Sequence, residues 1–264
     1  MIKISANITS NQNKYIKQVN ALKMKKERDK TNLFVIEGER IVFEIPDSWY
    51  TEYIIVSESY SKSENISFEK FSDIDVFCVP DELFIKISDT VSPQGILAVC
   101  RQKEFDFKEI IKKENPFFVM LERVCDPGNL GTIIRTADAA GADGVLLSKG
   151  CVDLYNNKVI RATMGSIFHL PIICNLDFVE VCDELKQNNI SMYAAHLKGN
   201  IFPYGLELTK GSAILIGNEA NGLSDEISDR ATKLVKIPMP GMAESMNASI
   251  AGSIFIYEVV RQRI

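Results

Sequence analysis

Three short stretches of the sequence concentrate polar residues that could bind a ligand or take part in proton chemistry. The last of them, residues 237–249, reads IPMPGMAESMNAS. Its prolines end a short apolar strand and its glycine permits a sharp turn, so Ser245 or Asn247 can cap a helix expected over residues 248–263. Side chains at the carboxyl end of a parallel strand commonly bind ligands. The stretch therefore indicates a site, although a plain strand, loop and capped helix would also explain it.

The second stretch, GNEANGL (217–223), directly follows the apolar run AILIG. Its two glycines, Gly217 and Gly222, would let the backbone approach a flat ligand closely. The glycine spacings of phosphate-binding loops are absent, which excludes a nucleotide phosphate cradle here. Asn221-Gly222 is also a strong turn signal, so a plain turn is the alternative.

The first stretch starts with DPGN (126–129), which is expected to be a turn after the apolar run PFFVMLERV. A helix is expected over residues 130–140 with Asn129 as its N-cap, because apolar residues recur there every three or four positions. At about 100° per residue, Arg135 then points away from the sheet. A guanidinium in that place can bind phosphate bidentately, whereas a solvated arginine paired with Asp138 is the simpler alternative.

In combination and in this order, the three stretches resemble the motifs of the SpoU or TrmH family of RNA ribose 2'-O-methyltransferases. The matching segments are NLGTIIRTADAAGADGVLL, LIGNEANGLSDE and IPMPGMAESMNASIAGSIFIYEVV, and the resemblance covers about 150 residues from Phe117 to the end. Upstream, FVIEGERIV and ISDTVSPQGILAV resemble the small RNA-binding domain, similar to a ribosomal-protein fold, that precedes the catalytic domain in many members.

The resemblance implies an enzyme that transfers a methyl group from S-adenosylmethionine to a ribose 2'-hydroxyl of structured RNA. Ribosomal RNA is favoured over transfer RNA, because the upstream domain resembles those of members that modify ribosomal RNA. A homodimer and a deep trefoil knot at the C-terminal edge of the sheet are also implied. By motif match, the expected catalytic residues are Asn129, Arg135, Glu219, Ser245 and Asn247, and the expected cofactor-lining residues are Ile216, Gly217, Ile237 and Met246.

Two positions depart from the family pattern. Met242 stands where an arginine is common in relatives, so this loop is not expected to supply a basic RNA contact. Met246 replaces a usual leucine, which is a volume-tolerant exchange. Two other functions stay open: a transfer-RNA-specific member of the family, and a non-catalytic RNA-binding or ribosome-assembly protein with the same fold. A small-molecule methyltransferase of the Rossmann type would need a glycine signature after its first strand, which is absent.

The charge distribution indicates where RNA could bind. The net charge is −5, yet residues 1–30 carry eight basic and two acidic side chains. A helix expected over residues 14–28 would have one apolar and one basic face, and lysines gain from releasing counterions around a polyanion. A solvated face is the alternative. The candidate RNA contacts are Lys14, Lys25, Lys26, Arg28, Arg135 and Arg161. Arg161 lies in a helix expected over residues 158–168, and a salt bridge is the alternative role for its side chain.

Strands that alternate with helices predict an α/β protein with a parallel sheet in its second half. The expected division is a basic helix and RNA-binding α/β domain at 1–103, a linker at 104–115, and a methyltransferase domain at 116–264. The six cysteines stand apart and there are two histidines, so we expect reduced core thiols and no metal site. His196 is expected to be a partly buried, hydrogen-bonded residue. No apolar run is long enough to span a membrane and no secretory signal is seen, which predicts a cytoplasmic protein.

Overall fold

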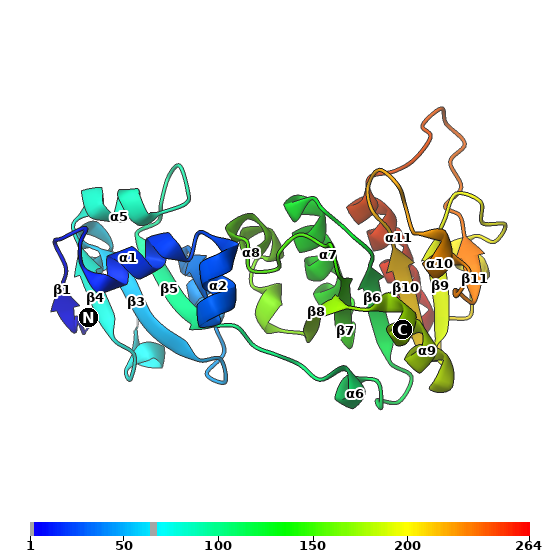
Figure 1. Ribbon diagram of the computed structural model, residues 1–264, viewed down its shortest axis with the longest axis horizontal. Helices are drawn as coiled ribbons and strands as arrows, with labels where there is room; N and C mark the ends of the chain where they lie inside the picture. Colours follow the sequence, from blue (N-terminus) through cyan, green and yellow to red (C-terminus); the bar gives the residue numbers. More distant parts are fainter. Residues whose placement is uncertain (1–2, 64–67) are drawn as a thin grey trace. The chain divides into compact units, whose positions relative to one another are not determined.

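The computed structural model describes residues 3–63 and 68–264 (Figure 1). The chain divides into two compact units. Unit 1 comprises Met1–Lys103 and Tyr155–Phe168, and unit 2 comprises Glu104–Leu154 and His169–Ile264. No helix in the described ranges has the length and apolar character that crossing a bilayer requires.

Unit 1 is a mixed sheet flanked by short helices. In chain order its elements are β1 (Ala6–Asn7), α1 (Lys14–Ala21), α2 (Lys25–Thr31), β2 (Leu33–Glu37), α3 (Glu39–Glu44), β3 (Thr51–Ser57), α4 (Glu58–Ser61), η1 (Glu69–Phe71), β4 (Val76–Val79), α5 (Asp81–Ile87), β5 (Ile96–Arg101), α8 (Asn157–Thr163) and η2 (Ser166–Phe168). The described strands run in the order β1-β4-β3-β5-β2. Strand β3 is parallel to β4, whereas β5 is antiparallel to both β2 and β3.

Two helices, α1 and α2, replace the single helix that the sequence predicts over residues 14–28. The apolar face of α1 is buried as expected, with Ile16 and Val19 at most 1% exposed. The break is held by Arg28, whose Nη1 donates to the carbonyls of Leu22 (2.7 Å) and Lys23 (2.9 Å) at the end of α1. Arg28 is itself only 3% exposed. The expectation that Arg28 contacts RNA is therefore wrong, because its guanidinium is buried and pairs with backbone.

Residues 155–168 pack within unit 1, although the expected linear division put them in the C-terminal domain. The ring of Tyr155 lies 4.5 Å from that of Phe34, and Phe168 lies 4.9 Å from Trp49. The helix expected over residues 158–168 ends early, because Met164 takes a positive φ of 52°. A left-handed residue followed by Gly165 breaks the α-helical path.

Unit 2 is a sheet with helices on both faces. In chain order its elements are α6 (Phe107–Ile110), β6 (Phe117–Leu121), α7 (Pro127–Ala139), β7 (Gly144–Ser148), β8 (Ile172–Leu176), α9 (Phe178–Gln187), β9 (Ser191–Ala195), η3 (Pro203–Gly205), β10 (Ser212–Ile216), α10 (Asp225–Ser228), β11 (Lys233–Val235) and α11 (Ala248–Arg263). The six described strands are all parallel and run in the order β11-β9-β10-β6-β7-β8.

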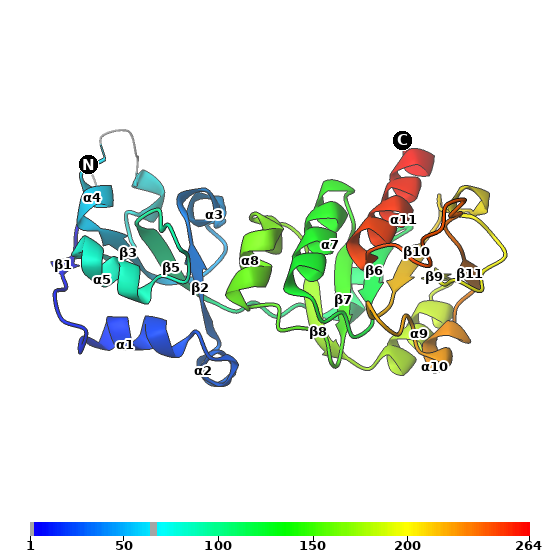
Figure 2. The same cartoon turned by 90° about the horizontal axis from the view of Figure 1, so that it is seen from above.

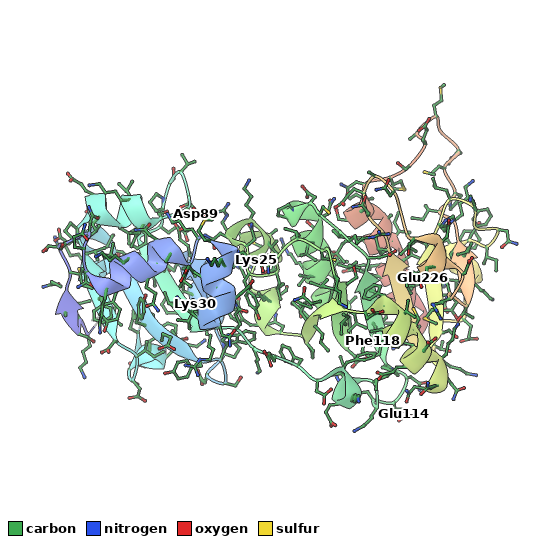
Figure 3. All side chains as sticks on the ribbon, in the orientation of Figure 1. Lys25, Lys30, Asp89, Glu114, Phe118 and Glu226 are labelled. Carbon is green, nitrogen blue, oxygen red and sulfur yellow. The ribbon has the colours of Figure 1, made fainter. Side chains whose placement is uncertain are left out.

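The sheet of unit 2 is covered on both sides, which explains why its central strands lack polar alternation. Every residue of β6 and β10 is buried. Figure 2 shows α7 and α11 on one side of the sheet and α9 and α10 on the other. Phe118 of β6 belongs to the core on the α9 side, where it is fully buried (Figure 3). Parallel strands of this kind send their following loops to one edge, where a site can form.

Replacing Arg28 with alanine is expected to destabilise unit 1. The change would leave two carbonyls at the end of α1 without their partner, and an unpaired buried polar group costs about 1–3 kcal/mol. The melting temperature measured by calorimetry should fall. The control is Lys26→Ala, an exposed position on the same helix, which should melt like the wild type. An unchanged melting temperature for Arg28→Ala would contradict this role.

Candidate active site

A cleft of about 430 Å³ lies in unit 2, where the loops after β9, β10 and β11 meet the start of α11. Its volume is in the range of small-molecule sites. Phe255 and Ala251 of α11 form part of its wall. The residues expected to bind a cofactor all line it, namely Ile216, Gly217, Ile237 and Met246.

A hydrogen-bonded cluster joins the three polar stretches beside this cleft. Glu219 Oε1 accepts from the side-chain amide of Asn129 (3.0 Å) and from the backbone N–H of Asp126 (3.0 Å). Its Oε2 accepts from the backbone N–H of Cys125 (3.1 Å). Asn129 Oδ1 in turn accepts from Asn247 Nδ2 (2.9 Å). Side chains 118 residues apart in sequence are thereby held at one place.

Asn129 reaches the cluster from inside a helix, and the expectation that it is the N-cap of α7 is wrong. The cap is Asp126, whose Oδ1 accepts from the Asn129 N–H (2.8 Å), and Pro127 takes the first helical position. Proline is favoured there because its missing N–H would have no partner in any case. The helix therefore begins three residues earlier in the chain than expected, and this turns the Asn129 side chain toward Glu219. The side chain is correspondingly buried, with Asn129 8% exposed.

Asn247 is the N-cap of α11, as one of the two expected candidates. Its Oδ1 accepts from the backbone N–H groups of Ser249 (2.9 Å) and Ile250 (3.3 Å), which leaves Nδ2 for Asn129. The amide therefore fixes the helix start and the cluster together. Ser245 lines the cleft, but no hydrogen bond joins it to the cluster within the described residues.

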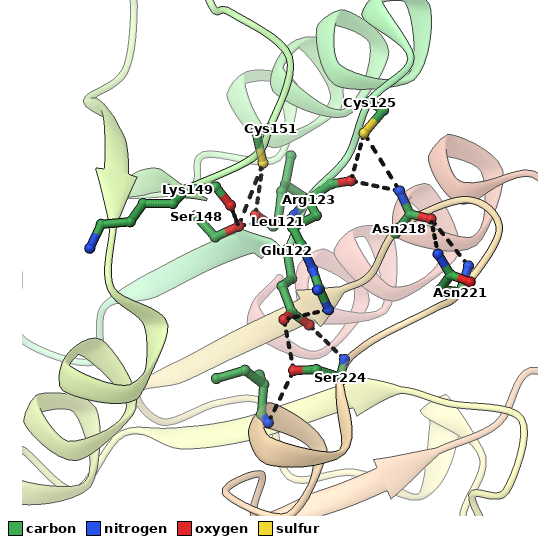
Figure 4. A network of polar contacts seen from close by, with 11 residues as sticks. Leu121, Glu122, Arg123, Cys125, Ser148, Lys149, Cys151, Asn218, Asn221 and Ser224 are labelled. Atoms are coloured by element: carbon green, nitrogen blue, oxygen red, sulfur yellow. Dashed lines mark hydrogen bonds and ion pairs between the residues drawn. The ribbon is translucent and has the colours of Figure 1, made fainter.

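The loop after β10 is tightly folded on itself. The N–H and C=O groups of Asn218 and Gly222 pair with each other at 3.0 and 2.9 Å, and Asn218 Nδ2 donates to the Arg123 carbonyl (Figure 4). A Cβ on Gly217 would lie 2.1 Å from the Gly222 carbonyl carbon. Gly217 is thus required for the loop to close on itself. It also lines the cleft, so the expected close approach of its backbone to a ligand stays a prediction.

The hydrogen bonds of the Glu219 carboxylate lower its pKa. Burial acts to raise the pKa of Glu219, but the hydrogen bonds from Asn129 and from the backbone of Cys125 and Asp126 outweigh it, so the net pKa lies below the usual value. These donors favour the charged form. Glu219 is therefore ionised at neutral pH, and it accepts hydrogen bonds from the three N–H groups above and from Asn218 Nδ2 at 3.4 Å.

Arg135 lies outside this cluster. Its neighbours Ile134 and Ala137 are buried, so Arg135 is exposed on the opposite face of α7, as the periodicity predicts. Asp138 pairs with His169 Nδ1 at 2.8 Å, not with Arg135. Within the described residues, Arg135 neither lines the cleft nor bonds to the cluster.

Residues 116–257 match the family model of the SpoU rRNA Methylase family, which is more than half of the chain. This chain belongs to the SpoU rRNA methylase family. Residues 13–98 match the MRM3-like substrate binding domain.

Relatives and solved structures agree with this membership over nearly the whole chain. The 23S rRNA (guanosine(2553)-2'-O)-methyltransferase RlmP of Bacillus subtilis (strain 168) is 34% identical over 253 residues, which are 96% of this chain and 98% of RlmP. An AdoMet-bound rRNA methyltransferase from Sinorhizobium meliloti is 31% identical with a TM-score of 0.84, and 98% of each chain is covered. The SpoU methyltransferase AviRb of Streptomyces viridochromogenes, in complex with AdoMet, is 27% identical with a TM-score of 0.85, and covers 96% and 98% of the two chains.

The cleft of this SpoU protein fits S-adenosylmethionine, the cofactor of the family. That molecule carries a flat apolar base, a sulfonium, and a zwitterionic amino-acid end. Ile216, Ile237 and Met246 offer apolar walls for the base. Glu244 and Lys198 line the same cleft and supply both signs of charge for the amino-acid end. Among the described residues there is no cluster of histidine, cysteine or acidic side chains that could hold a metal ion.

His196, Lys198 and Glu244 line the cleft but were not expected at a site. His196 Nδ1 accepts from the Lys198 N–H (3.1 Å), so it is hydrogen-bonded and half-buried as expected. The signal that could have revealed this loop is Gly199, where a Cβ would lie 2.7 Å from the Val235 backbone. A glycine shortly after a strand marks close backbone approach.

The candidate RNA contacts of the SpoU protein lie in unit 1, apart from Arg135. Lys25 forms an ion pair with Asp29 at 2.8 Å (Figure 3), and Lys26 is exposed. Lys14 sits 4.8 Å from the centre of the Tyr15 ring. These lysines stay solvent-facing and remain candidates.

Arg161, on α8, is the remaining candidate. Its Nη1 donates to the Asp89 carbonyl at 3.3 Å, so this contact is with backbone rather than the salt bridge that was the alternative. Arg161 is half-buried, and it stays a candidate RNA contact.

Replacing Glu219 with glutamine is expected to destabilise unit 2 in a pH-dependent way. A carboxylate with a lowered folded pKa contributes stability above its unfolded pKa of about 4.3, and this is lost as the pH falls through the folded value. The melting temperature of Glu219→Gln should therefore lie below that of the wild type at pH 7, and the difference should narrow on acidification below about pH 4. The matched control is Glu226→Gln, an exposed acidic position on α10. A difference that stays constant across this range would refute the role of the charge.

Proposed function

We propose that this protein transfers the methyl group of S-adenosylmethionine to a ribose 2'-hydroxyl of large-subunit ribosomal RNA. The observation that carries the proposal is the convergence of Asn129, Glu219 and Asn247 beside a cleft lined by Ile216 and Ile237. Membership of the SpoU family and similarity to RlmP over nearly the full length support it. Ribosomal RNA as substrate would place the protein in the cytoplasm.

Bound S-adenosylmethionine would supply an electrophilic methyl group. What the chain must add is alignment of the 2'-hydroxyl with that methyl and a route for the hydroxyl proton. Ile216, Gly217, Ile237 and Met246 would hold the cofactor. Asn129, Glu219 and Asn247 would act as positioning residues that keep the three loops in place around it. Ser245, exposed at the cleft, would contact the RNA or the cofactor directly.

Arg135 would bind the phosphate next to the target ribose and stabilise negative charge as it develops on the 2'-oxygen. A guanidinium stays protonated in proteins and is a poor base, so its contribution is electrostatic and orienting. Its side chain is exposed on α7, away from the cleft of its own protomer. We therefore place its action at the cleft of a partner subunit in a homodimer.

A homodimer is supported by the surface of α11. Ile250, Ile254 and Tyr257 recur at helical spacing and remain 50%, 37% and 53% exposed, which is unusual for an apolar stripe on a stable monomer. Helix α11 packs beside α7, and the hydroxyls of Ser253 and Thr136 are 3.3 Å apart. A partner that covers this stripe would thus lie close to the helix that carries Arg135.

The insertion of β10 between β9 and β6 agrees with the trefoil knot that the family resemblance implies.

Replacing Arg135 with alanine is expected to lower kcat for methyl transfer to a ribosomal-RNA transcript by about 100-fold or more, the usual loss for one transition-state donor. Arg135→Lys should recover part of the rate, because it keeps the charge but not the bidentate fork. Affinity for S-adenosylmethionine, measured by calorimetry, should not change. Thr132→Ala, exposed one turn earlier on α7, is the control. Near-normal turnover of Arg135→Ala would refute the assignment, and failure of the wild type to bind S-adenosylmethionine would favour a non-catalytic RNA-binding protein.

Replacing Ile250 with glutamate is expected to convert the dimer into monomers, because a buried unpaired carboxylate strongly opposes association. Sedimentation velocity should show a particle of half the mass. Val91→Glu, at a fully exposed apolar residue of unit 1, should leave the dimer intact. A wild-type protein that sediments as a monomer would contradict the proposed homodimer.

The substrate itself is tested by mapping 2'-O-methyl groups in total RNA from cells with and without the gene. The proposal predicts one large-subunit ribosomal position that loses its methyl group. A lost mark in transfer RNA instead would support a transfer-RNA-specific member of the family.

A further inference from the structure

A second cavity lies within unit 1, at the carboxyl ends of the parallel strands β3 and β4. It measures about 390 Å³ and is lined by Ser57, Ser59, Tyr60, Asp81, Ile85 and Gln94, among others. Its walls are rigid, because Gly95 takes a φ of +85° and a Cβ there would lie 2.7 Å from Ser57 Oγ. The turn at residues 93–95 is thereby packed closely against the start of α4. No role described so far uses this cavity.

Asp81 presents a fixed carboxylate to the cavity. Its Oδ1 accepts from the Ser59 N–H (3.1 Å) and its Oδ2 accepts from the Ser59 hydroxyl (2.6 Å). The Ser59 hydrogen bonds lower the pKa of Asp81, so it is ionised at neutral pH. Each carboxylate oxygen can accept a further hydrogen bond. A negative wall of this kind repels phosphate and attracts a ligand with neighbouring N–H donors.

Gln94 presents a donor to the same cavity. Its Oε1 accepts from the Glu39 N–H at 2.8 Å, which fixes the orientation of the amide. Its Nε2 makes no hydrogen bond to the described part of the chain. Gln94 is exposed, so this donor is free to bond to a ligand that enters the cavity.

Apolar surface completes the cavity. Ile85, which is 60% exposed, and Pro93 both line it. Apolar surface next to a few fixed polar groups can accept an unstacked nucleobase, which proteins recognise by its faces and by its Watson–Crick edge.

We propose that this cavity binds an unpaired guanine of the RNA substrate, at a position other than the methylated nucleotide. Guanine is the base whose Watson–Crick edge offers two adjacent N–H donors, at N1 and N2, which match the two oxygens of Asp81. Its O6 would accept from Gln94 Nε2. Adenine, cytosine and uracil each place an acceptor where guanine has one of those donors. The proposal rests on RNA being the substrate, as proposed above.

The test is saturation-transfer NMR on the full-length protein with guanosine 5'-monophosphate, in the presence of excess S-adenosylmethionine to fill the cleft of unit 2. Binding should be saturable, and adenosine 5'-monophosphate should bind about tenfold more weakly or worse, as for the loss of a bidentate base contact. Inosine 5'-monophosphate, which lacks only the N2 amino group, should also bind more weakly than guanosine 5'-monophosphate.

Two variants place the binding at this cavity. Asp81→Asn removes the paired acceptors, and Gln94→Glu keeps the acceptor for the Glu39 N–H but removes the donor to O6; each should weaken guanosine 5'-monophosphate about tenfold or more. Gln94→Glu leaves the Ser59 contacts of Asp81 untouched, so it tests the site even where Asp81→Asn disturbs α5. Glu82→Gln removes the same charge one residue away, is exposed and does not line the cavity, and should bind like the wild type.

Equal binding of the guanine and adenine nucleotides, or wild-type affinity in both variants, would overturn the guanine site. Because this measurement involves no methyl transfer, the two proposals fail separately. Methyl transfer without guanine selectivity would refute only this inference, and guanine selectivity without methyl transfer would refute only the proposed function.

Discussion

One carboxylate holds the candidate active site together. Glu219 accepts N–H groups from both the loop after β6 and the first turns of α7, while its own loop follows β10. Strands β6 and β10 are neighbours, with Leu121 opposite Ile216 at their ends, so the sheet brings the two loops to the same edge. The carboxylate then holds the two loops in a fixed arrangement, because each hydrogen bond to a charged acceptor contributes about 1.5–3 kcal/mol to stability.

Helix α11 extends that arrangement to the third loop. Asn247 caps the helix with one end of its amide and bonds to Asn129 with the other. Phe255, two turns along, is buried and forms part of the cleft wall. A single helix therefore anchors the cluster, closes the cleft and presents an apolar stripe to solvent. A change in the packing of α11 would therefore alter both the cleft and the proposed dimer surface.

Local sequence signals predicted the parts of the structure that depend on neighbouring residues. The start of α11 at Asn247, the outward face of α7 at Arg135 and the fully apolar strands of unit 2 all follow from capping and periodicity. The four expected cofactor residues do line the cleft, but that expectation came from the family resemblance rather than from periodicity.

Features that depend on distant contacts were missed. The break between α1 and α2 rests on the buried Arg28, and the need for Gly217 rests on a loop that closes onto Gly222. The N-cap of α7 was placed three residues too late, at Asn129 instead of Asp126, because Asn129 has a cap-type side chain that is in fact directed to Glu219. No local pattern reveals that a polar side chain has a partner 90 residues away.

The position of β10 has a consequence for how the protein is made. Its Ser212 pairs with Phe117 of β6, a strand that emerges from the ribosome long before it. Pairing of strands so distant in sequence is slow, because the long intervening segment must close into a loop before the pairing contributes any stabilisation. The strands of unit 1 lie within residues 6–101 and can pair much earlier during synthesis. A nascent chain would thus form the sheet of unit 1 while the sheet of unit 2 still lacks a central strand, so the cleft beside β10 would be the later of the two to form.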